Sequence, residues 1–256
     1  MIHVPRRRFG QHFLHDRNVI AKIIAAIDPR RGDHLVEIGP GQGALTEPLL
    51  NRLDALHVIE IDRDLIESLR ARFDAATLTI HAGDALEFDF GSLPQPLRVV
   101  GNLPYNISTP LLFHLARFSE RIVDGHFMLQ REVVDRMVAR PSTQDYGRLS
   151  VTLQARFEMT RLFVVGSGAF TPAPKVESAI VRMRPLAVSL VAGAIEPVFQ
   201  SVVTRAFTKR RKTLRNALAG VADQALLEML GIDPGLRPEA LSVHEFVRIA
   251  AALLHR

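Results

Sequence analysis

The sequence predicts an α/β fold with a mostly parallel sheet, followed by a small all-helical C-terminal domain. Strand-like apolar runs alternate with helical stretches from about residue 34 to residue 185, and the strand signals stop after Pro185. Such alternation is typical of a parallel sheet covered by helices on both faces. We therefore expect one domain over residues 1–190 and a helical domain over residues 191–256.

The individual elements follow from periodicity and turn residues. A helix is expected first, over residues 16–27, because Asp16 can cap it and an apolar stripe includes Ile23 and Ile24. Apolar runs predict strands at 34–39, 55–62, 78–84, 97–102, 125–133, 149–157 and 179–185. Helical stretches are expected at 44–53, 64–73 and 110–118, and again from residue 195 onward. Ligands of such sheets bind beyond the carboxyl ends of the strands.

Composition limits the class of protein. The chain has 256 residues, of which 47% are hydrophobic, and this is enough for one sizeable core. It has no cysteine, which excludes disulfides and cysteine-ligated metals and is compatible with a reducing compartment. No apolar run is long enough for a signal peptide or a membrane span. We expect a cytoplasmic protein with no metal and no membrane contact.

Positive charge gathers at the two ends of the chain. The formal net charge is +5; residues 1–31 carry seven basic and two acidic residues, and residues 186–256 carry nine and six. Basic ends around an acidic middle indicate an anionic partner. The densest run, RAFTKRRKTLR, has no acidic residue and is predicted to be a helix that holds an anionic partner, nucleic acid or a membrane surface. Its basic residues are Arg205, Lys209, Arg210, Arg211, Lys212 and Arg215.

A glycine turn and two carboxylates predict a nucleoside site. VEIGPGQGALT places Gly39, Gly41 and Gly43 after the first sheet strand, where glycines permit a tight turn and close approach of a ligand. Glu60 ends the next strand, 21 residues after Gly39, at the position where an acid can accept both hydroxyls of a ribose. Asp84 ends the third strand and could accept from an adenine amine.

The charge of this site favours one cofactor over another. A dinucleotide brings a pyrophosphate, which Glu37, Glu60 and Asp84 would repel. S-adenosylmethionine combines an adenosine with a cationic sulfonium and therefore fits these residues better than NAD.

GNLPYN, at the end of the 97–102 strand, predicts chemistry on an adenine amine. The Asn102 side chain and the Leu103 backbone offer two carbonyl acceptors, which can hold the amine's hydrogens and aim its lone pair. Pro104 fixes the turn, and Tyr105 offers a flat face to a base that has left its stack.

A second aromatic turn, GAFTPAPKVES, is expected to complete the base site. Phe170 could stack on the other face of the base, and Lys175 could meet a phosphate.

Together these motifs resemble the small-subunit ribosomal RNA adenine dimethyltransferase family. FGQHFLHD, VEIGPGQGALT, VIEIDRDL, GDAL, GNLPYNISTPLLFHL, LQREV, FTPAPKVES and RRKTLRNAL follow the family's order between about residues 8 and 218. The resemblance implies a Rossmann-like class I methyltransferase domain. It also implies dimethylation of two adjacent adenines near the 3′ end of 16S rRNA, in the assembling 30S subunit, by a monomer. The family's pattern has Asn where this chain has His12.

By motif position, the resemblance also implies which residues bind the cofactor. These are His12, Leu14, Gly39, Gly41, Glu60, Ile61, Asp84, Ala85 and Asn102.

Three other functions share parts of this pattern. A relative that methylates one adenine of 23S rRNA and confers macrolide resistance is the nearest. A DNA adenine methyltransferase would share the NxPY logic, but the short helical end leaves little room for target recognition. A non-catalytic assembly or transcription factor could keep the fold only to bind nucleic acid, although intact Asn102, Tyr105 and Glu60 argue against it.

Overall fold

The computed structural model describes residues 11–209 and 211–255, and these form two compact units. The sheet unit runs up to Val134 and includes Met159–Arg184; the helical unit comprises Asp135–Glu158 and everything described from Pro185 onward. The boundary between Arg184 and Pro185 is close to the one expected between residues 190 and 191. Residues 135–158, however, were expected in the first domain. They belong with the helical unit because Tyr146, Val151 and Ala155 are buried in that unit's core.

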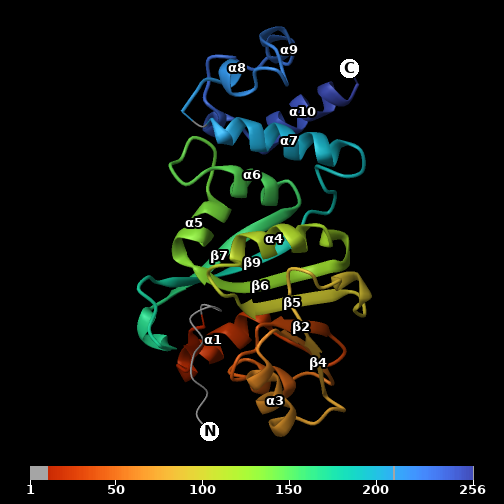
Figure 1. Ribbon diagram of the computed structural model, residues 1–256, viewed down its shortest axis with the longest axis vertical. Helices are drawn as coiled ribbons and strands as arrows, with labels where there is room; N and C mark the ends of the chain where they lie inside the picture. Colours follow the sequence, from red (N-terminus) through yellow and green to blue (C-terminus); the bar gives the residue numbers. More distant parts are fainter. Residues whose placement is uncertain (1–10, 210, 256) are drawn as a thin grey trace. The chain divides into compact units, whose positions relative to one another are not determined.

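A seven-stranded sheet forms the framework of the sheet unit, in the order β4-β3-β2-β5-β6-β9-β7 (Figure 1). The first five strands in this order are parallel, and β9 pairs with β6 antiparallel. The strands are β2 (His34–Ile38), β3 (Leu56–Glu60), β4 (Leu78–Ala82), β5 (Leu97–Asn102), β6 (Ile122–Gln130), β7 (Phe157–Val165) and β9 (Ser178–Pro185). This confirms the predicted α/β class and its mostly parallel sheet.

Helices alternate with these strands because their sequences carry caps and apolar stripes. Asp16 accepts hydrogen bonds from the backbone amides of Asn18 and Val19 and so caps α1, whose buried residues include Ile23 and Ile27. The helices of this part of the chain are α1 (Arg17–Ile27), α2 (Thr46–Leu50), α3 (Arg63–Arg72), α4 (Ser108–Ala116) and α5 (Arg131–Val138). None of the described helices is long and apolar enough to cross a membrane.

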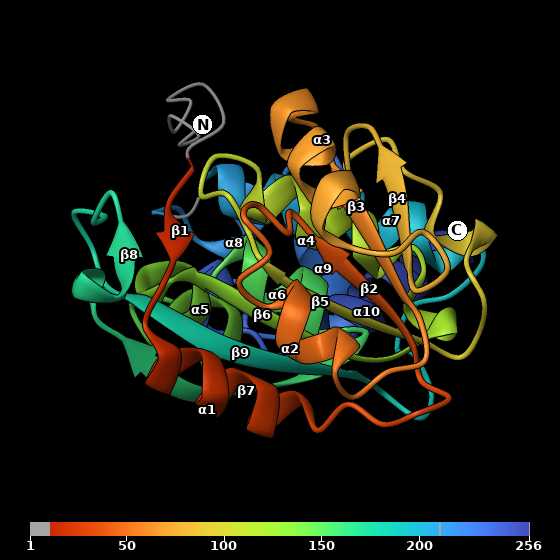
Figure 2. The same ribbon diagram turned by 90° about the horizontal axis from the view of Figure 1, so that it is seen from below.

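A small two-stranded sheet brings the N-terminal segment to the loop after β7. β1 (Phe13–Leu14) pairs antiparallel with β8 (Phe170–Thr171), so Leu14 lies opposite Phe170 (Figure 2). The backbone amide of His15 extends this pairing by donating to the Ala169 carbonyl. Segments more than 150 residues apart in the sequence are therefore neighbours, which periodicity alone could not predict.

The helical unit has its own apolar core. Its helices are α6 (Arg148–Gln154), α7 (Ile195–Thr208), α8 (Leu214–Ala217), α9 (Gln224–Met229) and α10 (Val243–Leu254). Phe199, Val203, Phe246 and Ile249 are fully buried where α7 packs on α10. Ser242 and Glu245 form a reciprocal capping box that fixes the start of α10.

One strand prediction is wrong. Residues 149–157 were expected to be a strand, but Leu149–Leu153 lie in α6, and β7 begins only at Phe157. LSVTL alternates apolar residues with Ser150 and Thr152, which is the period of a strand, but all five residues are buried in the helix. The strand expected at 125–133 corresponds to β6, which ends at Gln130. Residues 131–133 of the expected strand belong to α5 instead.

Candidate active site

A cavity of about 280 Å³ lies at the carboxyl ends of β2, β3, β4 and β5, where the sheet topology predicts a ligand. All nine residues predicted to bind the cofactor line it, as do Leu103, Pro104 and Tyr105. They reach it from separate strand ends because each parallel strand delivers its last residues to the same edge of the sheet.

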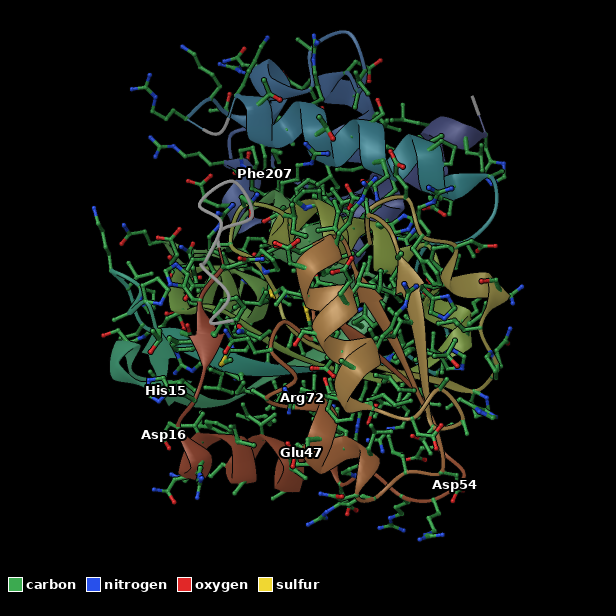
Figure 3. All side chains as sticks on the ribbon, turned by 60° about the horizontal axis from the view of Figure 1, so that its bottom comes forward. His15, Asp16, Glu47, Asp54, Arg72 and Phe207 are labelled. Atoms are coloured by element: carbon green, nitrogen blue, oxygen red, sulfur yellow. The ribbon has the colours of Figure 1, made fainter. Side chains whose placement is uncertain are left out.

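The glycine loop after β2 forms one wall. Gly39, Gly41 and Gly43 have φ angles of +66°, +57° and +80°, which side-chain-bearing residues rarely adopt. A Cβ on Gly41 would lie 3.2 Å from the Phe13 ring, so the N-terminal segment packs directly on this turn. The Arg72 guanidinium braces the loop from outside, donating to the Gln42 carbonyl at 2.6 Å and pairing with Glu47 (Figure 3).

Glu60 is fixed at the end of β3 by backbone donors. One carboxylate oxygen, Oε1, accepts from the amides of Ile61 and Asp62 at 2.9 Å, and Oε2 accepts from Gly41 at 3.3 Å. Burial raises its pKa, while these three bonds act in the opposite direction. A carboxylate has about four lone-pair sites. Glu60 therefore keeps acceptor capacity for a ligand, and its contact with a ribose stays a prediction.

Asp84 lies beyond β4 in a half-exposed position. Its Oδ1 accepts from the Leu86 amide at 2.9 Å, the hydrogen bond of an Asx turn. Among the described residues no donor is bonded to Oδ2, so this oxygen can accept from a ligand at the cavity.

Glu37, in β2, lines the cavity as a buried acid. It is 2% exposed, and its Oε2 accepts from the Thr46 hydroxyl at 2.7 Å. Burial raises the pKa of Glu37 to about 8, with the Thr46 hydrogen bond opposing and the nearby Glu60 charge adding to the rise. At neutral pH this carboxyl is therefore largely protonated in the folded protein.

Glu37→Gln is expected to make folding stability less dependent on pH. Because the folded-state pKa lies above the ordinary 4.5, Glu37 favours folding at low pH. That contribution is lost as pH rises, by up to about 1.4 kcal/mol per pH unit between 4.5 and about 8. A glutamine stays neutral, so the variant's stability relative to wild type should increase from pH 5 to pH 8. Urea denaturation at several pH values measures this; parallel curves for the two proteins would contradict the assignment, and Glu67→Gln, on the exposed side of α3, is the control.

The remaining lining suits a cationic nucleoside. Ile61 is an apolar side chain left 47% exposed at the cavity, where the flat face of a base could cover it. Among the described lining residues there is no Lys or Arg, and three are acids. Even with Glu37 largely protonated, Glu60 and Asp84 disfavour a polyphosphate and are compatible with adenosine bearing a positive sulfonium.

Asn102 ends β5 with its amide held in one orientation. Its Nδ2 donates to the backbone carbonyl of His12 at 3.1 Å. No donor of the described residues is bonded to Oδ1, or to the backbone carbonyl of Leu103. Both acceptors that the sequence predicts are therefore open. Residue 12 holds Asn102 through its main chain, so this contact does not depend on which side chain stands at that position.

Tyr105 is also held rather than mobile. Its hydroxyl is 2.8 Å from the Ser178 hydroxyl, and its ring stacks on His12 with centroids 5.5 Å apart. The His12 Nδ1 is 2.7 Å from the Pro172 carbonyl oxygen, to which it donates. Ser178 and Pro172 were not predicted for this role. The pairing of β1 with β8 brings Pro172 to His12, whereas the pairing of β9 with β6, the neighbour of β5, brings Ser178 to Tyr105.

Phe170 does not lie where the sequence predicts. It is 3% exposed and packs in the core with Leu14 and Ala169, and it does not line the cavity. Its position in β8, opposite Leu14, turns it toward the core instead of toward a base. Lys175 is exposed in the loop after β8 and does not line the cavity.

The basic run is not one helix as predicted. α7 ends at Thr208, Lys209 leaves helical geometry with ψ at 40°, and α8 begins only at Leu214. Lys209, Arg211 and Lys212 line a surface hollow with Thr208 and Asn216, while Arg205 donates to the Ala219 carbonyl. Arg215 is exposed on α8. Arg210, and the basic N-terminal segment with Arg6–Arg8, lie outside the described residues.

This fold and cavity define a class I methyltransferase. The family model described as ribosomal RNA adenine dimethylase matches residues 2–254. A small-subunit ribosomal RNA methyltransferase A from Chromobacterium violaceum is 60% identical over 97% of this chain and 95% of its own. Two crystal structures are also similar to this chain.

A dimethyladenosine transferase from Plasmodium falciparum has a TM-score of 0.81 and 25% sequence identity, with 93% of this chain and 96% of that chain covered. The 23S rRNA methyltransferase ErmE has TM-score 0.72 and 28% identity, with 94% and 99% covered.

The chain belongs to the ribosomal RNA adenine dimethylase family. It is an enzyme that uses S-adenosylmethionine, which confirms the class of reaction and the cofactor predicted from the sequence.

Proposed function

We propose that this protein dimethylates the N6 amines of two adjacent adenosines near the 3′ end of 16S rRNA, during assembly of the 30S subunit. It acts in the cytoplasm as a monomer. The observation that carries the proposal is the pair of open acceptors, Asn102 Oδ1 and the Leu103 carbonyl, beside a cavity that holds no described cation. The relatives named for the small ribosomal subunit support 16S rRNA over 23S rRNA, because they are far more similar to this chain than ErmE is.

Each cavity residue has a role in this proposal. Glu60 would hold a ribose hydroxyl through Oε2, and Asp84 would accept from the adenine amine of the cofactor, which lies against Ile61. The bound cofactor supplies a methyl group on a positive sulfur. Asn102 and Leu103 would accept the two hydrogens of the target amine and orient its lone pair. Tyr105 offers a stacking face near them.

Methyl transfer from labelled S-adenosylmethionine to undermethylated 30S subunits tests the proposal. We expect label on two adjacent adenosines of 16S rRNA, mapped by nuclease digestion and mass spectrometry. Undermethylated 50S subunits and duplex DNA are tested in parallel as the alternative substrates. Label on 23S rRNA or DNA alone would reject the substrate, and no transfer to any of them would favour a binding protein without catalysis.

The basic hollow on the helical unit is proposed to hold RNA phosphates. Replacing Arg211 and Lys212 by Gln should lower the slope of log affinity for 30S subunits against log salt by roughly 1–2, because each phosphate contact releases counterions. Affinity for S-adenosylmethionine should not change. Arg136→Gln/Arg140→Gln removes the same charge from other exposed sites of this unit. If the two double variants have equal slopes, the hollow has no special role and the basic run is solvated surface.

A further inference from the structure

A second hollow lies at the other end of the sheet from the cofactor cavity. It is about 540 Å³ and opens where β2 and β5 begin and β9 ends, with residues from the end of α1 at its rim. The cofactor cavity is lined by the last residues of β2 and β5, whereas this hollow is lined by their first residues. The two sites therefore lie at opposite ends of the same strands.

Strand register gathers the polar lining on one face of the sheet. In the strand register, Arg98 of β5 lies opposite Asp124 of β6, and His126 of β6 lies opposite Arg182 of β9. Side chains two residues apart on a strand point to the same face. Arg184 therefore shares the face of Arg182, and His126 shares the face of Asp124.

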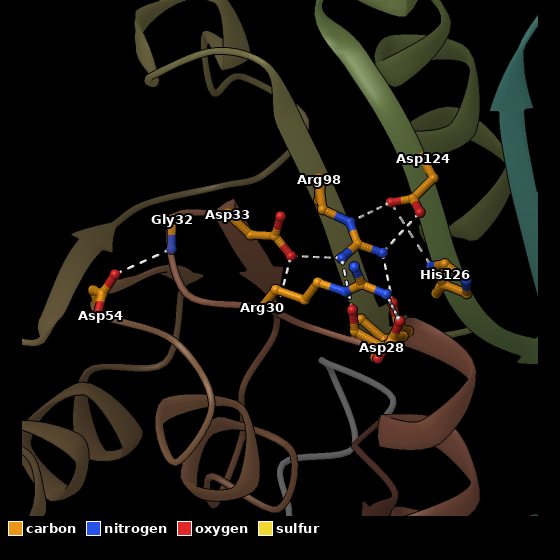
Figure 4. A network of polar contacts seen from close by, with 9 residues as sticks. Asp28, Arg30, Gly32, Asp33, Asp54, Arg98, Asp124 and His126 are labelled. Carbon is orange, nitrogen blue, oxygen red and sulfur yellow. Dashed lines mark hydrogen bonds and ion pairs between the residues drawn. The ribbon is translucent and has the colours of Figure 1, made fainter.

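Arg98 already neutralises the acids of the hollow (Figure 4). It donates to both Asp124 oxygens, at 2.9 and 2.8 Å, and to Asp33 at 2.7 Å, and it also bonds the Ile27 carbonyl. At the rim, Asp28 pairs with Arg30 at 2.8 Å. The three aspartates of the lining are thus paired within the protein.

Three side chains of the hollow, those of Arg182, Arg184 and His126, make no hydrogen bond with any described residue. No hydrogen bond or ion pair within the described residues engages the side chain of Arg182 or Arg184. The His126 side chain is 2% exposed, yet neither ring nitrogen has a hydrogen-bond partner. Its Nδ1 is 4.0 Å from Asp124, too far for a hydrogen bond. With four arginines and three aspartates, the lining has a net charge of +1.

We propose that this hollow binds a phosphate group, held by the guanidinium groups of Arg182 and Arg184 and by a ring N–H of His126. Two guanidinium forks and one N–H match an anion with several acceptor oxygens, and phosphate is the biological anion with that geometry. An anion there would give the buried imidazole the partner that it lacks and satisfy a group whose isolation is otherwise costly. Burial holds the pKa of His126 at about 4, so a bound phosphate should raise it.

The His126 imidazole is a site-specific reporter. Its ring resonances would be followed by NMR during titration with inorganic phosphate, against a chloride titration of equal ionic strength, and assigned with His126→Phe. We expect a saturable shift with phosphate alone. In Arg182→Gln/Arg184→Gln the dissociation constant should increase by about 10-fold or more, as expected when charged hydrogen bonds are lost. Arg70→Gln/Arg117→Gln, exposed elsewhere on the sheet unit, should titrate like wild type.

A short RNA without terminal phosphates distinguishes the source of the phosphate. If it shifts the same resonance, the ligand is an RNA backbone phosphate; if only inorganic phosphate does, it is a free phosphate or a nucleotide. The site is rejected if neither probe moves the His126 resonance, or if the Arg182→Gln/Arg184→Gln variant responds as wild type does. None of these outcomes depends on the methylation substrate.

Discussion

Asn102→Ala is expected to slow methyl transfer by about 100- to 1,000-fold, the loss typical when a preorganised group acting on developing charge is removed. In this protein the carbonyl of the amide is aimed by the bond from Nδ2 to the His12 carbonyl. Alanine removes the open acceptor and leaves the target amine with the Leu103 carbonyl alone. The fold should survive, because Asn102 is only partly buried at a strand end.

Single-turnover kinetics on undermethylated 30S subunits, at saturating S-adenosylmethionine, measure this effect. Cofactor affinity is determined separately by calorimetry, because Asn102 also lines the cofactor cavity. Asn51→Ala removes an exposed amide outside the cavity and should react at the wild-type rate. A near-normal rate for Asn102→Ala would show that the amide does not act on the reacting amine.

Glu60→Gln is expected to weaken S-adenosylmethionine binding by roughly 10- to 100-fold, the equivalent of one charge-assisted hydrogen bond. The substitution keeps one carbonyl oxygen for the amides of Ile61 and Asp62. It places an NH₂ group where Oε2 accepts from Gly41, so that donor would face donor. A ribose hydroxyl would then lose its charged acceptor.

Glu60→Ala is the less specific variant. It leaves three backbone N–H groups without their acceptor, so we expect a lower melting temperature as well as weaker binding. Calorimetric titration with a thermal melt separates the two effects, and Glu67→Gln on α3 controls for the lost charge. Wild-type affinity in Glu60→Gln, with a normal melt, would remove Glu60 from the cofactor site.

The cofactor cavity could be predicted from the sequence because its residues come from strand ends. Gly39, Glu60, Asp84 and Asn102 each follow an apolar run, and parallel strands bring such residues to one edge without any knowledge of packing. The buried helix α6 was mistaken for a strand by the same reasoning, because LSVTL alternates apolar residues with Ser150 and Thr152, and this is the period of a strand.

The residues that hold the site in place could not be found in this way. Ser178 and Pro172 contact Tyr105 and His12 from elements distant in sequence, and Thr46 reaches Glu37 across the glycine loop. Phe170 was misplaced for the same reason, since its pairing with Leu14 decides which way it faces.

By itself, the sequence determined the α/β class, the family, the cofactor and the residues at the ends of the parallel strands, because strand periodicity and glycine turns are local properties. Only the tertiary structure decided which atoms remain free to act. It showed that Glu60 has already given three acceptor positions to backbone amides, and that the open oxygen of Asn102 results from a bond to a carbonyl 90 residues away. It also brought Arg182 beside His126. Such facts depend on strand register and on the satisfaction of each hydrogen-bonding group, and these are settled only when the whole chain has packed.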